Sequence, residues 1–219
     1  GHFNIQDLPT NFSESLESGV RGLRLGWSPD LGSLPVDPEV RRVTYKAVQV
    51  LEEQGASVSQ ADIELDHECL RDVVQTIWYS DHAANLGELV STMGDLMTPL
   101  FGEKVKEAMH WPAARLAYAL RELEWHRARM DAIMQRYDLL LTPVMATPAY
   151  PLGERPAVID GKAVDPHWGF SPITFLFNMS GHPAASVPCG FSSGGLPIGL
   201  HVIGHKKAEA MVLRLSAAF

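Results

Sequence analysis

The sequence has little that would mark a protein that binds nucleic acids or a membrane. Its 18 lysines and arginines are outnumbered by 26 aspartates and glutamates, giving a formal net charge of −8, and no basic run offsets this balance. Because phosphate backbones are bound mainly through clustered Lys and Arg, we expect no nucleic-acid partner. No apolar stretch approaches the roughly 20 residues needed to cross a bilayer, so we expect no membrane partner either.

Cysteine is equally scarce. Cys69 and Cys189 could form one disulfide at most, and both lie in apolar segments where a reduced, buried thiol is the ordinary state. The N-terminus also lacks the charged and then apolar pattern of a secretory signal. The simplest interpretation is a cytoplasmic protein.

The usual marks of a catalytic nucleophile are missing as well. The chain has no G-x-S-x-G motif, and the paired serines Ser192 and Ser193 lie in a Gly-rich turn with no adjoining base. Turn chemistry accounts for both of them. We therefore predict that no catalytic residue lies in this chain.

Metal ligands are also not expected. Asp66–Cys69 contains four ligand types, but four consecutive residues at a helix start point in different directions, and Asp66 there offsets the helix dipole. His201 and His205 are four residues apart, yet Gly204 bends the chain between them. We predict neither a metal site nor a cofactor.

What the chain does contain is an α/β pattern. Its 219 residues, 46% of them hydrophobic, permit one sizeable core or half of a larger one. A short strand at Leu23–Trp27 precedes a helix that Asp37 caps and that ends at Gly55, and Ala56–Leu65 returns as a strand. This order predicts a crossover unit in a sheet.

Helical spacing predicts further helices at Asp66–Leu89, near Glu103–Met109, from Ala113 onward and at Ala208–Phe219. Phe3–Ser18 is interpreted as a connecting segment, Tyr137–Leu141 as a strand and Pro143–Asp165 as a loop. The apolar faces expected for the first, second and fourth helices along the chain are Val40, Val43, Ala47, Val50 and Leu51; Leu70, Val73, Val74, Ile77 and Trp78; and Leu116, Leu120, Leu123, Met130 and Met134.

Two apolar runs near the C-terminus predict a hairpin. Pro183–Pro188 and Pro197–Gly204 are separated by a Gly-rich turn. Alternation in the second run places Ile198, Leu200 and Val202 on one face and Gly199 and His201 on the other, as expected for a half-buried strand.

This stretch resembles the C-terminal core of the amidase signature family, whose members carry F-N-x-x-G-x-P-A-x-S-V-P-x-G followed by G-L-P-x-G-x-x-x-x-G. The matching residues are Phe177–Gly190 and Gly195–Gly204, supported by Asp138–Pro143 and by Leu23–Trp27 with Val36–Val40. The resemblance covers nearly the whole chain but only the latter half of the family's length. It implies an α/β fold with a mixed β-sheet flanked by helices, with residues 1–219 forming the C-terminal portion of a single amidase-type domain and residues 1–20 connecting it.

The family's nucleophilic serine, its second serine and its lysine base belong to a Gly- and Ser-rich loop in the half that this chain does not match. The resemblance therefore implies that the chain supplies pocket wall and scaffold. The segment before the hairpin would line the acyl side of the pocket, and its candidate substrate-binding residues are Trp168, Phe170, Ser171, Ile173, Thr174 and Phe177. Apolar lining with a few polar groups suits a small-molecule cleft.

The implied activity is hydrolysis of a carbon–nitrogen amide bond through a serine acyl-enzyme in the full-length parent, whereas this chain alone would be inactive. The alternatives are a glutamine-hydrolysing subunit of an amidotransferase and a non-catalytic scaffold or binding module. Expected partners are a small-molecule amide and the missing N-terminal half of the same enzyme. Because a half-sheet exposes edge groups, we also expect dimers or larger homo-oligomers.

Overall fold

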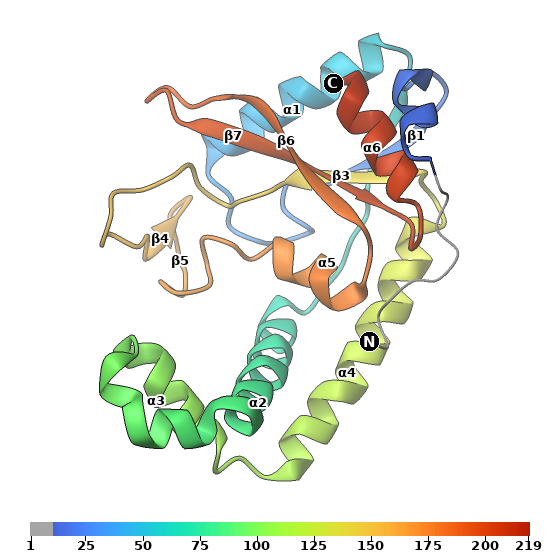
Figure 1. The fold of residues 1–219 in the computed structure, drawn as a ribbon. Coiled ribbons are helices and arrows are strands. Elements are labelled where there is room, and N and C mark those ends of the chain that lie inside the picture. The colour runs from blue at the N-terminus through green and yellow to red at the C-terminus, as the bar shows by residue number, and fades with distance from the viewer. Residues whose placement is uncertain (1–10) are drawn as a thin grey trace. The chain divides into compact units, whose positions relative to one another are not determined.

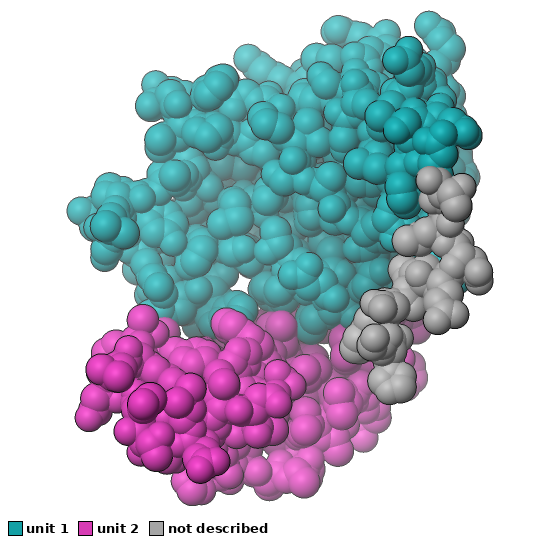
Figure 2. Space-filling model, viewed as in Figure 1, with its two compact units in different colours: residues 1–65, 129–219 teal, residues 66–128 magenta. Residues whose placement is uncertain are grey.

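The computed structural model describes residues 11–219, which fall into two compact units (Figure 2). One unit comprises residues up to Leu65 together with Arg129–Phe219, and the other comprises Asp66–Ala128. Residues 3–10 of the expected connecting segment lie outside the described residues. That the chain belongs to a single amidase-type domain stays a prediction.

The first unit is built on a five-stranded mixed sheet in the order β2-β1-β3-β7-β6. β1 pairs in parallel with β2 and β3, whereas β7 pairs antiparallel with β3 and β6. The strands span Arg24–Trp27 (β1), Ser57–Gln60 (β2), Leu139–Pro143 (β3), Ala184–Phe191 (β6) and Pro197–Gly204 (β7). The predicted mixed α/β sheet flanked by helices is confirmed.

The crossover from β1 through α1 (Pro38–Glu53) to β2 is also confirmed. The Asp37 carboxylate accepts a 2.7 Å hydrogen bond from the Glu39 amide and so caps α1. Two details of the prediction were wrong. β2 ends at Gln60 rather than Leu65, and Val50 is 41% exposed while Val48 is fully buried. Val48 lies three residues before buried Leu51, which places both on the stripe that meets the sheet.

The hairpin β6–β7 forms as predicted, with a bulge between Pro188 and Gly190 that carries β6 on to Phe191. β7 is not half-buried, however, because His201 and Ile203 are 5% and 0% exposed. Figure 1 shows the cause: α1 and α6 (Glu209–Ala218) cover one face of the sheet and α5 (Thr174–Ser180) lies on the other.

Two connecting segments are more ordered than expected. Ser13–Ser18 forms a 3-10 helix against α6, where the Ser15 hydroxyl donates to the Ala210 carbonyl at 3.1 Å. The predicted loop Pro143–Asp165 contains a small hairpin, β4 (Val158–Ile159) and β5 (Lys162–Ala163). Asp160 and Gly161 have the positive φ that a two-residue hairpin turn requires, so the prediction of a loop throughout was wrong.

The second unit contains α2 (His67–Met93), the 3-10 turn Gly94–Leu96, α3 (Pro99–Ala108) and the first part of α4 (Ala113–Met134). The Asp66 carboxylate caps α2 by accepting from the Cys69 amide at 3.0 Å. The apolar faces predicted for α2 and α4 were partly wrong, because Trp78 and Leu120 are 43% and 46% exposed. The core of this unit consists of Tyr79, Val90, Val105 and Ala108. No helix in residues 11–219 is long and apolar enough for a membrane span.

Candidate functional site

A tight turn opens the candidate segment. The Asp165 carboxylate accepts from the backbone amides of His167 and Trp168 at 2.8 and 3.3 Å, and the Asp165 carbonyl accepts from Gly169 at 2.7 Å. A Cβ atom at Gly169 would lie 2.5 Å from the Val164 Cβ. Only glycine fits at that position, and the turn delivers Trp168 at the start of the segment.

Backbone and ring contacts hold the aromatic residues in place. The Phe170 carbonyl accepts from the Ala146 amide at 3.0 Å, which ties the segment to the chain that follows β3. The Phe170 ring meets Tyr150 edge to face at 5.4 Å, and Trp168 meets Phe175 in the same way at 6.1 Å. Such pairs are favourable beyond the area they bury, so both side chains have defined orientations.

Two hydroxyl groups meet at the start of α5. The Ser171 Oγ lies 3.0 Å from the Thr174 Oγ1, and the Ser171 amide donates to the Trp168 carbonyl at 3.1 Å. Both side chains are half-buried. The pair offers hydrogen-bond donors and acceptors and carries no charge.

The structure divides the six candidate residues into two groups. Trp168, Phe170, Ser171 and Thr174 are half-buried, whereas Ile173 and Phe177 are 0% and 1% exposed. Phe177 packs edge to face against His201 at 5.2 Å. The first group could contact a bound molecule from this chain's surface, while the second supports it from within. That all six line a substrate pocket stays a prediction.

Ser192 and Ser193 occupy the turn between β6 and β7, as predicted. The Ser192 carbonyl accepts from the Gly195 amide at 2.9 Å, and the Ser192 hydroxyl accepts from the Leu196 amide at 3.1 Å. The Ser193 amide and hydroxyl donate to the Glu39 carboxylate at 2.9 and 3.2 Å. Ser192 therefore closes the turn, and Ser193 ties the turn to α1.

Comparison with known proteins assigns the family. The family model described as Amidase matches residues 3–213. The chain belongs to the amidase family. An acylamidase from Rhodococcus erythropolis is 31% identical over 226 residues, which cover 99% of this chain and 46% of that protein. A glutamyl-tRNA(Gln) amidotransferase subunit from Brevibacillus brevis is 30% identical, over 97% of this chain and 47% of its own length.

A solved structure agrees with this assignment. The crystal structure of a bacterial aryl acylamidase belonging to the amidase signature enzymes superposes with a TM-score of 0.87 and 27% identity, over 97% of this chain and 46% of that one. The chain thus spans about half the length of the amidase-family relatives that it matches. The resemblance that the hairpin motifs indicated is confirmed, and the chain corresponds to a C-terminal portion of such proteins.

The two histidines of β7 and its following turn bind different partners in this amidase-family chain. The His201 Nδ1 lies 3.4 Å from the Thr142 Oγ1, and the His205 Nε2 donates to the Tyr137 carbonyl at 2.8 Å. Burial lowers the pKa of His201 to about 4. Burial also raises the pKa of the Cys189 thiol to about 11, so this thiol is protonated at neutral pH and is a poor nucleophile.

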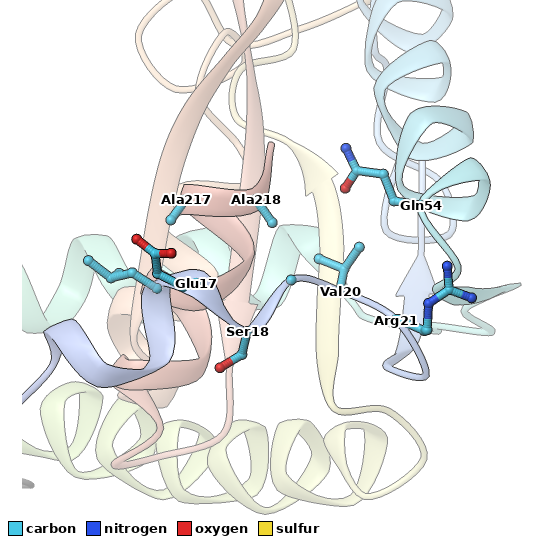
Figure 3. A pocket seen from close by; sticks show the side chains of 9 residues that line it. Glu17, Ser18, Val20, Arg21, Gln54, Ala217 and Ala218 are labelled. Carbon is cyan, nitrogen blue, oxygen red and sulfur yellow. The ribbon is translucent and has the colours of Figure 1, made fainter.

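Two surface hollows of the first unit lie away from the candidate segment. One, of about 750 Å³, is lined by the chain leading into β1 and by the C-terminal ends of α1 and α6, with Arg21 and Gln54 on one side and Glu17 and Ala218 on the other (Figure 3). The other, of about 570 Å³, lies where β1 and β2 end. Neither hollow is lined by any of the six candidate residues.

A polar cluster around one buried histidine escaped prediction. The His182 side chain is 1% exposed, with Nδ1 2.9 Å from the Ser180 Oγ and Nε2 3.4 Å from an Asp131 carboxylate oxygen. The other Asp131 oxygen accepts from the Lys206 ammonium at 2.8 Å. These groups come from α4, the end of α5, the α5–β6 turn and the turn after β7, and no sequence spacing linked them. The contact of His201 with Phe177 was missed as well. Alternation along the strand had predicted only that His201 and Leu200 lie on opposite faces of the sheet.

Proposed function

We propose that the chain is the C-terminal portion of an amide hydrolase and contributes pocket wall and scaffold. The observation that carries this proposal is the amidase-family match over residues 3–213, together with the structural likeness to an aryl acylamidase. In the proposed reaction a serine from the N-terminal half attacks the amide carbonyl, the amine leaves with a proton, and water hydrolyses the ester to release the acid. The resemblance assigns that serine, the second serine and the lysine base to the other half.

The role proposed for this chain is to hold the acyl group. Trp168 and Phe170 have fixed ring orientations at the surface of the segment, and Ser171 and Thr174 place two hydroxyl groups beside them. Ile173 and Phe177 support this surface from the core. Apolar side chains with a few convergent polar groups favour a small, neutral ligand.

The substrate class proposed is a neutral amide with an apolar or aromatic acyl group. The resemblance implies that glutamine-using members carry an acidic residue seven positions before the asparagine of the F-N motif, and Ser171 occupies that position here. Loss of a charge-assisted hydrogen bond in a buried pocket costs about 1.5–3 kcal/mol. The complete enzyme should therefore prefer neutral amides with an apolar or aromatic acyl group over free glutamine.

Glutamine hydrolysis for an amidotransferase is the second candidate, because several relatives are named as components of glutamyl-tRNA(Gln) amidotransferases. A non-catalytic scaffold remains the alternative from another class. The formation of homo-oligomers stays a prediction.

The test is turnover of an apolar aryl amide and of glutamine by the full-length parent, before and after Ser171→Asp, with the purified chain alone as the blank. We expect the parent to prefer the aryl amide, Ser171→Asp to shift this preference toward glutamine by roughly tenfold or more, and the chain alone to turn over neither. Better turnover of glutamine by the unmodified parent would support the amidotransferase candidate. A parent without any amidase activity would support the scaffold.

A further inference from the structure

His201 is a buried polar residue on an inner strand of the sheet. It lies on β7, with Thr142 of β3 and Ser186 of β6 as its register partners on either side. Its neighbours along the strand, Leu200 and Val202, are fully buried on the opposite face. A buried polar side chain is costly unless its groups are satisfied, so the contacts of this imidazole bear on why it is there.

The hydroxyl of Thr142 determines which nitrogen of the His201 ring carries the proton. The Thr142 hydroxyl lies 2.9 Å from the Pro143 carbonyl and 3.4 Å from the His201 Nδ1. A carbonyl can only accept, so the hydroxyl donates its single proton to Pro143. With its proton given to Pro143, the threonine oxygen can only accept from His201, which assigns the imidazole proton to Nδ1 and orients one end of the ring.

The other constraint comes from α5. The His201 ring meets Phe177 at 5.2 Å and 82°, an edge-to-face pair, and Phe177 is 1% exposed. One ring is thus held by β3 through a hydrogen bond and by α5 through an aromatic contact. An aliphatic side chain at the same position could fill the space but could not be oriented by Thr142.

α5 depends on such contacts because it is weak by itself. The helix has seven residues, and its first flanking residue, Ile173, makes no side-chain cap. Helices shorter than about 12 residues are marginal in water. Only its C-terminus is closed locally, where Gly181 in the left-handed conformation donates to the Phe177 carbonyl at 2.9 Å. The position of α5 therefore comes from packing on the sheet (Figure 1).

We propose that His201 is a positioning residue that fixes α5 on the sheet through Phe177, and with α5 the preceding segment Trp168–Thr174. The consequence for substrate rests on the proposed function, since that segment is the one assigned to the acyl group. The coupling between His201 and α5 does not rest on it. His201 itself lies beneath α5 and acts only through the helix that it holds.

Hydrogen–deuterium exchange of the purified chain tests the coupling without any activity. In His201→Ala the amides of 168–180 should exchange about tenfold faster, which corresponds to about 1.4 kcal/mol, while those of α6 change much less. Thr142→Val keeps the aromatic contact and frees the ring to rotate, so it should give a smaller change in the same peptides. His201→Gln serves if the alanine variant does not fold.

Val202→Ala is the matched control, because it truncates the next residue of the same strand on the face covered by α1 and α6. It should accelerate exchange in α6 at least as much as in 168–180. Equal acceleration of both regions by the His201 variants, or no change at 168–180, would overturn the proposal.

Kinetics of the parent then separate the two proposals. If the segment lines the acyl pocket, His201→Gln should raise KM for an aryl amide and leave kcat within about twofold, because the nucleophile is supplied elsewhere. If the His201 variants accelerate amide exchange mainly at 168–180 but leave KM unchanged, the positioning role is retained and the pocket assignment is refuted. If KM changes while exchange at 168–180 is not selectively accelerated, the positioning role is refuted.

Discussion

The two units differ in the size of their buried apolar cores. In the first unit Leu25, Leu141 and Leu200 are 0% exposed and form one core between the sheet and the helices α1 and α6. The second unit has a core of four buried residues. Both units also carry exposed apolar side chains, with Leu96 and Trp125 of the second 85% and 69% exposed and Phe191 of the first 68% exposed. The inner strands β3 and β7 have helices or loops on both faces and bury nearly all of their side chains, whereas helices packed on one another bury only a stripe each.

The largest effect that would sharpen this comparison is a truncation in the sheet core. Leu141→Ala should lower the free energy of unfolding by about 2–5 kcal/mol, because it leaves a cavity where β3 packs. Leu96→Ala, in the second unit, should change it by less than about 0.5 kcal/mol. Urea unfolding of both variants measures the difference. Similar losses would mean that Leu96 is packed in a core and is not the exposed side chain described above.

The next effect is the dependence on pH that His201 gives to the stability of the first unit. Burial lowers the pKa of His201 to about 4, while an unfolded histidine titrates near 6.5. Below pH 6.5 the unfolded chain binds a proton that the folded chain refuses until about pH 4. The free energy of unfolding is therefore unaffected by this titration above about pH 6.5, and it falls by up to about 3 kcal/mol as the pH drops toward 4.

The unfolding free energy of the wild type and of His201→Gln, measured between pH 7 and pH 4, isolates this contribution. Arg24 holds the pKa of Asp138 below its usual value, so that pair also loses stability in acid, and to a similar extent in both proteins. The gap between the two curves should narrow toward pH 4. Parallel curves would show that His201 does not titrate in this range.

The comparison also explains which parts of the fold could be predicted. The crossover through α1 was predictable because Asp37, Pro38 and Gly55 mark both helix ends and a single stripe faces the sheet. The hairpin was predictable from two apolar runs and a Gly-rich turn. The burial of Val48 in place of Val50 was also open to prediction, because Val48 lies on the same helical stripe as Val40 and Leu51 and Val50 does not, and the expected face overlooked this.

The candidate site was less accessible to prediction. The family resemblance pointed to Trp168–Phe177, but Phe175, Leu176 and Phe177 form an unbroken apolar run with no period to assign and no cap, so α5 could not be foreseen. The burial of Ile173 and Phe177 follows from that helix. Contacts between distant residues, such as His182 with Asp131, leave no local signal in a single sequence.

The smallest predicted effect concerns the polar contacts that hold the second unit together. Arg115 forms an ion pair with Asp72 at 2.8 Å, donates through Nε to the buried Thr76 hydroxyl at 3.1 Å and stacks 3.9 Å above the Trp111 ring. The ion pair is largely exposed and contributes little, so the loss in Arg115→Ala should come from Thr76 and Trp111, about 1–2 kcal/mol in total. Arg115→Lys should recover less than half of it, because an ammonium group reproduces neither the Nε bond nor the planar stacking.

Lys104→Ala, which removes only the exposed pair with Glu107, is the control and should cost under about 0.5 kcal/mol. Full rescue by lysine in urea unfolding would show that charge, rather than the geometry of the guanidinium group, holds α2 to α4.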